Sequence, residues 1–214
     1  MADRFGRSGA GGIQAHASSS DRSNASSGAR IAVLSSDPGG HVQALLEDPL
    51  VGPWIALVVA ERPDAYGLRH ARWHGVPAVA LRAGKSYLDL YDLALARLLE
   101  EHAIDHVFVG GFRRIVGTVT VHAYEDRIAK VHHSLLPELP GPDPVADALA
   151  QGVDKTGVTV HLINRELEVG RIVSQQALEI RDGETWHSLV QRLHQLELRL
   201  LPAAINRLVE GTRA

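Results

Sequence analysis

Two adjacent histidines near the middle of the chain are the residues best suited to chemistry. Residues 128–131 predict a short buried strand, and His132 and His133 follow it directly, with Ser134 next. In open α/β sheets, ligands bind outside the carboxyl ends of the strands, so this position favours a functional site. Histidine has the side-chain pKa nearest neutrality, which suits it to proton transfer. The stretch therefore predicts a site of acid–base chemistry.

A second candidate for chemistry is the turn after the first predicted strand. Gly39 and Gly40 end this turn, and a helix is expected to follow. A strand, a glycine-containing turn and a helix in this order present backbone N–H groups to a phosphate. Asp37 and Pro38 oppose that use, because aspartate repels an anion and proline has no N–H. An altered phosphate-binding loop and a plain strand-to-helix turn both stay open.

The elements that must position these residues alternate between strand and helix. Strands are expected at residues 30–34, 54–60, 76–81, 105–109, 128–131, 157–163 and 172–180. Helices are expected at about residues 41–47, 62–75, 87–102, 144–151 and 182–210. This alternation predicts an α/β fold, a doubly wound and mostly parallel Rossmann-like sheet with helices on both faces. We expect residues 39–40, 110–116 and 132–134 to converge at its carboxyl edge.

Composition indicates a globular cytoplasmic protein. The chain has 214 residues, a net charge of −3, 45% hydrophobic residues and no cysteine, and no apolar run approaches the length of a membrane span. Residues 1–29 are rich in Gly, Ser and Ala and predict a disordered leader, which leaves 30–211 as the folded domain. The charge balance gives no reason to expect nucleic acid or a membrane as partner. No metal ligands are assigned.

The central stretch resembles a known motif. Residues 130–137 read Lys-Val-His-His-Ser-Leu-Leu-Pro, which is similar to the Asn-x-His-Pro-Ser-Leu-Leu-Pro motif of folate-dependent formyltransferases, in particular the glycinamide ribonucleotide transformylases of purine synthesis. His132 falls on the family histidine, Lys130 takes the place of the asparagine, and His133 that of the proline. Residues 111–115 also match the family's Gly-Phe-x-Arg-Ile segment. The resemblance covers about residues 30–211 and implies the formyltransferase fold.

The resemblance also implies a reaction. A formyl group would pass from 10-formyltetrahydrofolate, the donor, to a small-molecule amine through a tetrahedral oxyanion. The candidate catalytic residues are His132, Lys130 and Glu168, the last in place of a family aspartate. His132 would transfer the proton or hold the oxyanion, and Glu168 would support it. Two interpretations of Lys130 stay open: its cation stabilises the oxyanion, or the family reaction is lost and the side chain reaches solvent. Because Lys130 is close to His132 in sequence, its charge should lower the pKa of the histidine.

Binding residues follow from the same resemblance. The candidate folate-binding residues are Phe112, Arg113, Arg114, Ile115, Val116, Glu166, Leu167 and Gly170. The candidate acceptor-binding residues are Gly39, Gly40, His133 and Glu197. Glu197 matches a family glutamate near the acceptor's amine and ribose, and a solvated helix face is the alternative interpretation. His161 is interpreted as a structural histidine.

Several family positions are altered together. The phosphate loop, Lys130 and Glu168 differ, and Leu88 takes the place of a phosphate-binding arginine, while the core pattern is kept. That combination favours changed or lost function on an intact scaffold. Four interpretations stay open: a formyltransferase acting on another amine, a glycinamide ribonucleotide transformylase, a non-catalytic folate- or partner-binding protein, and a formyltetrahydrofolate hydrolase. A monomer or homodimer is expected.

Overall fold

The structure is a computed structural model of the whole chain. It describes residues 28–36, 40–82, 88–112, 114, 116–164 and 169–211. The predicted leader, residues 1–29, therefore lies outside the described residues except for Gly28 and Ala29. Ala29 already packs against the core.

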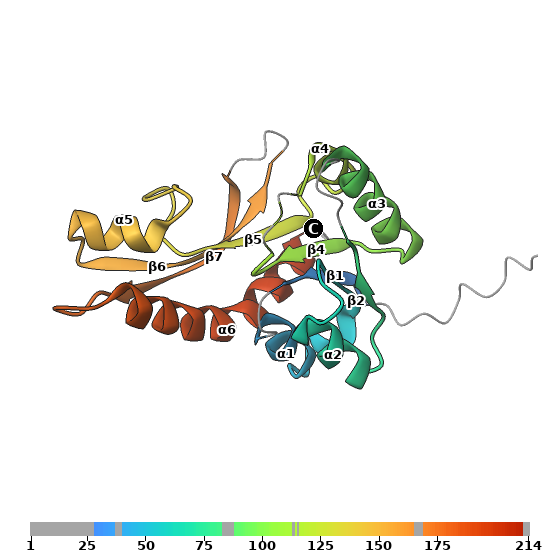
Figure 1. Cartoon of the computed structure of the whole chain (residues 1–214), viewed down its shortest axis with the longest axis horizontal. Helices are drawn as coiled ribbons and strands as arrows, with labels where there is room; N and C mark the ends of the chain where they lie inside the picture. Colours follow the sequence, from blue (N-terminus) through green and yellow to red (C-terminus); the bar gives the residue numbers. More distant parts are fainter. Residues whose placement is uncertain are drawn as a thin grey trace, which may run out of the picture.

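Seven strands form one sheet in the order β3-β2-β1-β4-β5-β6-β7 (Figure 1). The strands are β1 (Ile31–Leu34), β2 (Ile55–Ala60), β3 (Ala78–Ala80), β4 (His106–Val109), β5 (Ile128–His132), β6 (Lys155–Ile163) and β7 (Val169–Glu179). The first five pair in parallel, whereas β6 runs antiparallel to both β5 and β7. The prediction of a mostly parallel α/β sheet is confirmed.

The helices connect these strands as expected, with two additions. They are α1 (Gly40–Leu46), α2 (Tyr66–Trp73), α3 (Leu88–Glu101), α4 (Thr118–Ala123), α5 (Pro144–Gln151) and α6 (Trp186–Gly211), with a short 3-10 turn at Gly52–Trp54. The sequence did not predict α4, because its Thr-Val-Thr-Val segment is rich in β-branched residues with low helix propensity. Asp92 of α3 holds its first turn by accepting hydrogen bonds from the backbone N–H groups of Val119 and Thr120.

Helices cover both faces of the parallel strands, and β1 shows how. Ile31 and Val33 point into a core formed with α1, α2 and the second half of α6. Ala32 and Leu34 point the other way, into a core formed with α3 and α4. Successive strand residues face opposite sides of a sheet, so a fully apolar strand fits between two helical layers. The predicted layers are therefore confirmed.

The antiparallel strands β6 and β7 extend beyond the parallel part of the sheet. In Figure 1, β6, β7, α5 and the first half of α6 extend to one side as an arm. A separate buried cluster holds this arm together, with Val145 of α5 and Val158 of β6 packed against Leu189 and Leu193 of α6. Farther along α6, Leu201 belongs to the core under α1 and α2. The junction between the two parts of α6 is therefore next to the carboxyl ends of the parallel strands.

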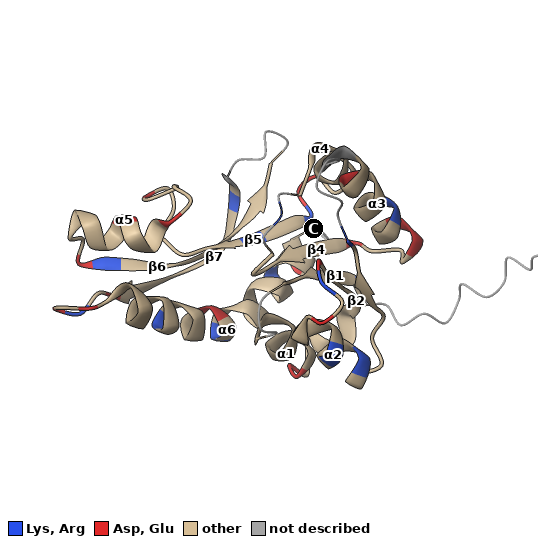
Figure 2. Ribbon diagram, viewed as in Figure 1, with Lys and Arg blue, Asp and Glu red and all other residues tan. Residues whose placement is uncertain are grey.

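The surface has no dominant charge. Figure 2 shows acidic and basic residues interspersed along the described chain, in keeping with the net charge of −3. None of the helices in the described ranges is long and apolar enough to cross a membrane.

Candidate functional site

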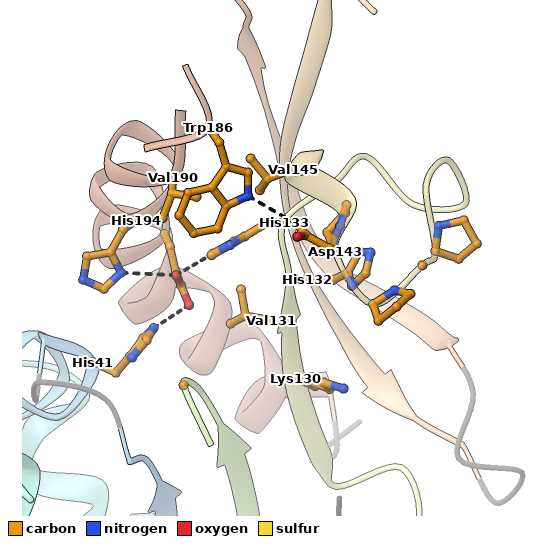
Figure 3. Close-up of a pocket in the computed structure, with 16 residues that line it drawn as sticks. His41, Lys130, Val131, His132, His133, Asp143, Val145, Trp186, Val190 and His194 are labelled. Atoms are coloured by element: carbon orange, nitrogen blue, oxygen red, sulfur yellow. Dashed lines mark hydrogen bonds and ion pairs between the residues drawn. The ribbon is translucent and has the colours of Figure 1, made fainter. Parts of the chain in front are cut away.

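A cleft of about 790 Å³ lies between the end of β5, the start of α1 and helix α6 (Figure 3). Its polar lining comes mainly from His41, Lys130, His132, His133, His194 and Glu197. Of the segments expected to converge at the carboxyl edge, Gly111, His132 and His133 line this cleft, and His41 lines it directly after Gly40, whereas Phe112, Arg114 and Val116 do not.

The arm forms the opposite wall of the cleft. Trp186, Val190 and Val145 contribute apolar surface. The indole N–H of Trp186 donates to Oδ1 of Asp143 at 3.4 Å. The same carboxylate caps α5 by accepting from the N–H of Ala146. An apolar wall with a few fixed polar groups is typical of a small-molecule site.

His132 is held at the end of β5 by the loop that follows it. Its Nε2 donates to the carbonyl oxygen of Leu139 at 2.9 Å, since a carbonyl can only accept. Within the loop, the Ser134 hydroxyl donates to the carbonyl of Glu138 at 2.6 Å. Burial lowers the pKa of His132, and the neighbouring Lys130 and His133 lower it further, against the opposing effect of the Leu139 bond. The ring is therefore neutral at pH 7, with Nδ1 as its basic nitrogen.

Lys130 is an exposed residue of β5 that lines the cleft and points away from His41 and His194 (Figure 3). It lies opposite His161 in the β5–β6 register. His161 is buried, and its Nδ1 donates to the carbonyl of Leu162 at 2.9 Å. Burial lowers the pKa of His161, against the opposing effect of the Leu162 bond, and the neighbouring His132 and Lys130 lower it further. The burial and backbone bond of His161 fit the structural role expected for it.

Glu197 is surrounded by three histidines. Its carboxylate is 2.5 Å from Nε2 of His41, 2.9 Å from Nε2 of His133 and 3.5 Å from Nδ1 of His194. The residue is only 2% exposed, so the alternative of a solvated helix face is wrong. Burial alone would raise the pKa of Glu197, but hydrogen bonds from His133, His194 and His41 hold it well below its usual value. Glu197 is thus an anion at the base of the cleft.

Gly40 contributes close packing to this cluster. A Cβ placed on Gly40 would lie 3.0 Å from Nε2 of His194, so a larger residue at the start of α1 would push the imidazole away. Gly39, Asp37 and Pro38 lie outside the described residues. The assignment of this turn to acceptor binding stays a prediction.

Three of the predicted folate-binding residues, Phe112, Arg114 and Val116, lie on the α3 side of the sheet. Phe112 packs against the core under α3, where Val116 is buried. The guanidinium of Arg114 lies 5.0 Å from the ring centre of Tyr91, and its Nε is 3.7 Å from Oε1 of Glu61. None of these residues lines the cleft around His132.

Gly170 lies in β7, where an added Cβ would be 2.9 Å from the carbonyl oxygen of Leu162. The remaining candidates, Arg113, Ile115, Glu166, Leu167 and Glu168, lie outside the described residues. The assignments of these residues and of Phe112, Arg114, Val116 and Gly170 stay predictions.

Sequence reasoning did not select His41 or His194. Neither has a local motif, because the cluster joins the first turn of α1, the end of β5 and the middle of α6. His41 and Glu197 are 156 positions apart. The one usable signal is spacing within α6, where His194 precedes Glu197 by three residues and so shares its helix face.

Comparisons with known proteins agree on one family. A family model described as formyl transferase matches residues 29–205. A phosphoribosylglycinamide formyltransferase from Mycobacterium tuberculosis is 37% identical over 180 residues, which are 83% of each chain. The enzyme of that name from Bacillus subtilis is 31% identical over 185 residues, or 84% of this chain and 94% of the relative.

A solved structure shares the fold as well. The crystal structure of glycinamide ribonucleotide transformylase 1 from Symbiobacterium toebii matches with a TM-score of 0.79 and 35% identity, covering 86% of this chain and 89% of that one. The similarity thus spans both the parallel sheet and the antiparallel arm.

Proposed function

Because the chain belongs to the formyl transferase family, whose formyl donor is 10-formyltetrahydrofolate, we propose that it transfers the formyl group to a small-molecule amine other than glycinamide ribonucleotide. The cluster of three histidines around Glu197 carries this proposal. It occupies the base of the cleft, next to Gly40, which the resemblance assigns to acceptor binding.

His132 suits the proton transfer that this reaction needs. The acceptor nitrogen attacks the formyl carbon, the resulting tetrahedral oxyanion collapses, and the bond from that carbon to N10 of the folate breaks. One proton leaves the attacking amine and one reaches N10. A neutral histidine with a free basic Nδ1 can carry out both transfers, and the bond from Nε2 to Leu139 fixes its orientation.

Lys130 supplies the cation for the oxyanion. Its ammonium group lines the same cleft as His132, two residues earlier on β5. A charged donor stabilises an oxyanion more strongly than a neutral amide does. In this proposal Glu168 supports His132 or a relay water.

The charges around the cleft argue against direct recognition of a phosphate. Among the described lining residues, Lys130 is the one Lys or Arg, while Asp143 and Glu197 are carboxylates. Leu88 takes the place of the family's phosphate-binding arginine, and the turn before α1 contains Asp37 and Pro38. An acceptor without a phosphate ester is the better match.

Glycinamide ribonucleotide formylation is the second candidate. The two curated relatives at 37% and 31% identity both have the name phosphoribosylglycinamide formyltransferase. His132 and Glu197 also fall on family positions. This candidate requires that the reaction still proceeds with Lys130, Glu168 and Leu88 in place of the family's residues.

One assay separates the candidates. The full chain is incubated with 10-formyltetrahydrofolate alone, with glycinamide ribonucleotide, and with a panel of non-phosphorylated amines, and tetrahydrofolate, formate and formylated amine are measured. Formylation of a panel amine but not of the nucleotide supports the proposal. Turnover with the nucleotide alone supports the second candidate, formate without any amine indicates a hydrolase, and folate binding without turnover indicates a non-catalytic protein.

A further inference from the structure

We propose that His41, His194 and Glu197 form a binding site for one divalent transition-metal ion, with Zn²⁺ as the expected ion. The inference stands on the arrangement of these side chains. It does not depend on whether the chain transfers a formyl group, so the two proposals can fail separately.

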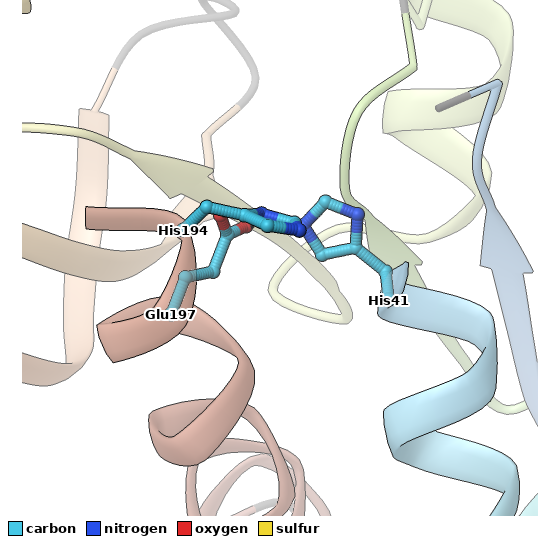
Figure 4. Close-up of side chains that lie close together, drawn as sticks. All are labelled: His41, His194 and Glu197. Carbon is cyan, nitrogen blue, oxygen red and sulfur yellow. Dashed lines mark hydrogen bonds and ion pairs between the residues drawn. The ribbon is translucent and has the colours of Figure 1, made fainter. Parts of the chain in front are cut away.

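The donor atoms converge on one point (Figure 4). The ring nitrogens of His41 and His194 and a carboxylate oxygen of Glu197 all lie within 4.8 Å of one another. A tetrahedral ion with ligands at about 2.0–2.1 Å holds those ligands about 3.3–3.4 Å apart. Oε1 of Glu197 is 2.5 Å from Nε2 of His41, which is shorter than that separation, and Oε2 is 3.5 Å from Nδ1 of His194, which is close to it. Small side-chain shifts would open the position for the ion.

The type of donor points to the class of metal. Two imidazoles and one carboxylate form a set that binds Zn²⁺ and its borderline neighbours, whereas Mg²⁺ and Ca²⁺ prefer oxygen ligands throughout. Three protein ligands leave one position of a tetrahedral ion open, as in catalytic zinc sites. The cluster lines the cleft, so this open position would face a bound small molecule.

His133 would act as an outer partner of the ion. Its Nε2 donates to Oε2 of Glu197 at 2.9 Å, while Oε1 faces His41. Carboxylate ligands are commonly oriented by such a hydrogen bond to the oxygen that does not bind the metal. The arrangement thus has both the ligands and a residue that positions one of them.

Two of the three proposed ligands are buried, and the third is partly exposed. His41 and Glu197 are 4% and 2% exposed, and the side chain of His194 is 40% exposed towards solvent. The rings of His41 and His194 meet edge-on with centres 5.3 Å apart, and the absence of a side chain at Gly40 leaves room for the ring of His194. Two ligands are therefore preorganised by packing, and the third gives the ion a route in.

The test is metal binding by the full, tag-free chain after treatment with a chelator. Zn²⁺ is titrated by calorimetry, with Mg²⁺ as the oxygen-preferring comparison, and Co²⁺ is followed by its visible absorption, which is intense in a tetrahedral site. We expect one Zn²⁺ per chain at micromolar affinity or tighter, no comparable Mg²⁺ binding, and an intense Co²⁺ spectrum.

Variants locate the ion. His194→Gln lies on a half-exposed helix position, so the fold should be retained, and it should weaken Zn²⁺ binding at least tenfold. His41→Ala combined with His194→Gln should abolish stoichiometric binding. His187→Ala is the matched control, because His187 is an exposed histidine of the same helix that contacts Gln191. Absent Zn²⁺ binding, or equal binding by the folded double variant and the parent, overturns the proposal, as does an equal loss in the control.

Discussion

His132 and Leu139 are joined by a hydrogen bond of 2.9 Å from the imidazole Nε2 to the backbone carbonyl. The bond fixes which ring nitrogen carries the proton in the neutral state, so Nδ1 is the nitrogen available to a substrate. It also ties the end of β5 to the loop that follows. The two residues are seven positions apart, so His132 and the loop that orients it belong to one continuous segment of the sequence.

Replacing His132 should remove most of the formyl transfer. A positioned acid–base or oxyanion group contributes a factor of roughly 10²–10⁴ to rate, so His132→Ala should lower kcat roughly a hundredfold or more. The affinity for a reduced folate should change little, because the loss falls on the transition state. Steady-state kinetics with whichever amine the chain formylates, together with folate calorimetry, measures both quantities.

His122→Ala is the control for that experiment. His122 is an exposed histidine at the end of α4 and does not line the cleft, so the variant should keep the parent rate. Unchanged turnover in His132→Ala would contradict the catalytic assignment and favour a non-catalytic protein.

The rate should persist to more acid pH than an ordinary histidine allows. Burial first, and then Lys130 and His133, lower the pKa of His132, so protonation of the base occurs below the usual value of about 6.5. The acid limb of kcat/KM against pH should therefore have its midpoint below about 6.5. In the unfolded chain His132 has its ordinary pKa of about 6.5, whereas in the folded chain its pKa is lower. Its contribution to stability is therefore present above pH ~6.5 and is lost as the pH falls through the folded-state pKa.

Lys130→Gln tests the part of that pKa shift that comes from Lys130 rather than from burial. Removing the cation should move the acid midpoint upward, whereas Lys155→Gln, an exposed lysine at the start of β6, should leave it in place. A midpoint that stays unchanged in Lys130→Gln would mean that the ammonium group lies too far from His132 to act on it.

Most of the fold was predictable because the signals are local. Apolar strands such as β1 and β4, the leucine stripe of α3 and the turns between them specify an alternating α/β order. Topology rules then place the strands. Helix α4 was not predictable, since its own residues favour a strand and its first turn depends on Asp92, 28 positions from Thr120.

The candidate site, like the fold, was predictable from the sequence only where its signals are local. His132 and His133 could be selected because a strand end and a histidine pair adjoin in sequence. The burial of Glu197 and its contacts with His41 and His194 depend on how α1 and α6 pack across the sheet edge. Periodicity along α6 shows which residues share a face, but not which face meets another charged or polar group.

The buried carboxylate of Asp92 holds the start of α4, and its contribution to stability can be measured. It is 5% exposed and accepts hydrogen bonds from the N–H groups of Gly117 and Val119 and from the Thr120 hydroxyl. Asp92→Ala would leave these buried donors unpaired, which should lower the free energy of unfolding by about 2–4 kcal/mol. Urea denaturation measures the change. Asp64→Ala, in an exposed pair with Arg62, should have little effect, and equal stabilities would show that the α4 cap contributes nothing.

Lys130→Asn is the sharpest test of whether the altered residues mark a new acceptor. It restores the family amide beside His132, and Glu168→Asp restores the family carboxylate. If Lys130 serves another amine, Lys130→Asn should lower the rate with that amine and give no formylation of glycinamide ribonucleotide, alone or with Glu168→Asp, because Leu88, Asp37 and Pro38 still leave its phosphate without donors. Formylated nucleotide is quantified by mass spectrometry, with His132→Ala in the same background as the blank. A double variant that gains activity on the nucleotide over the parent would show instead that the chain is a weakened transformylase.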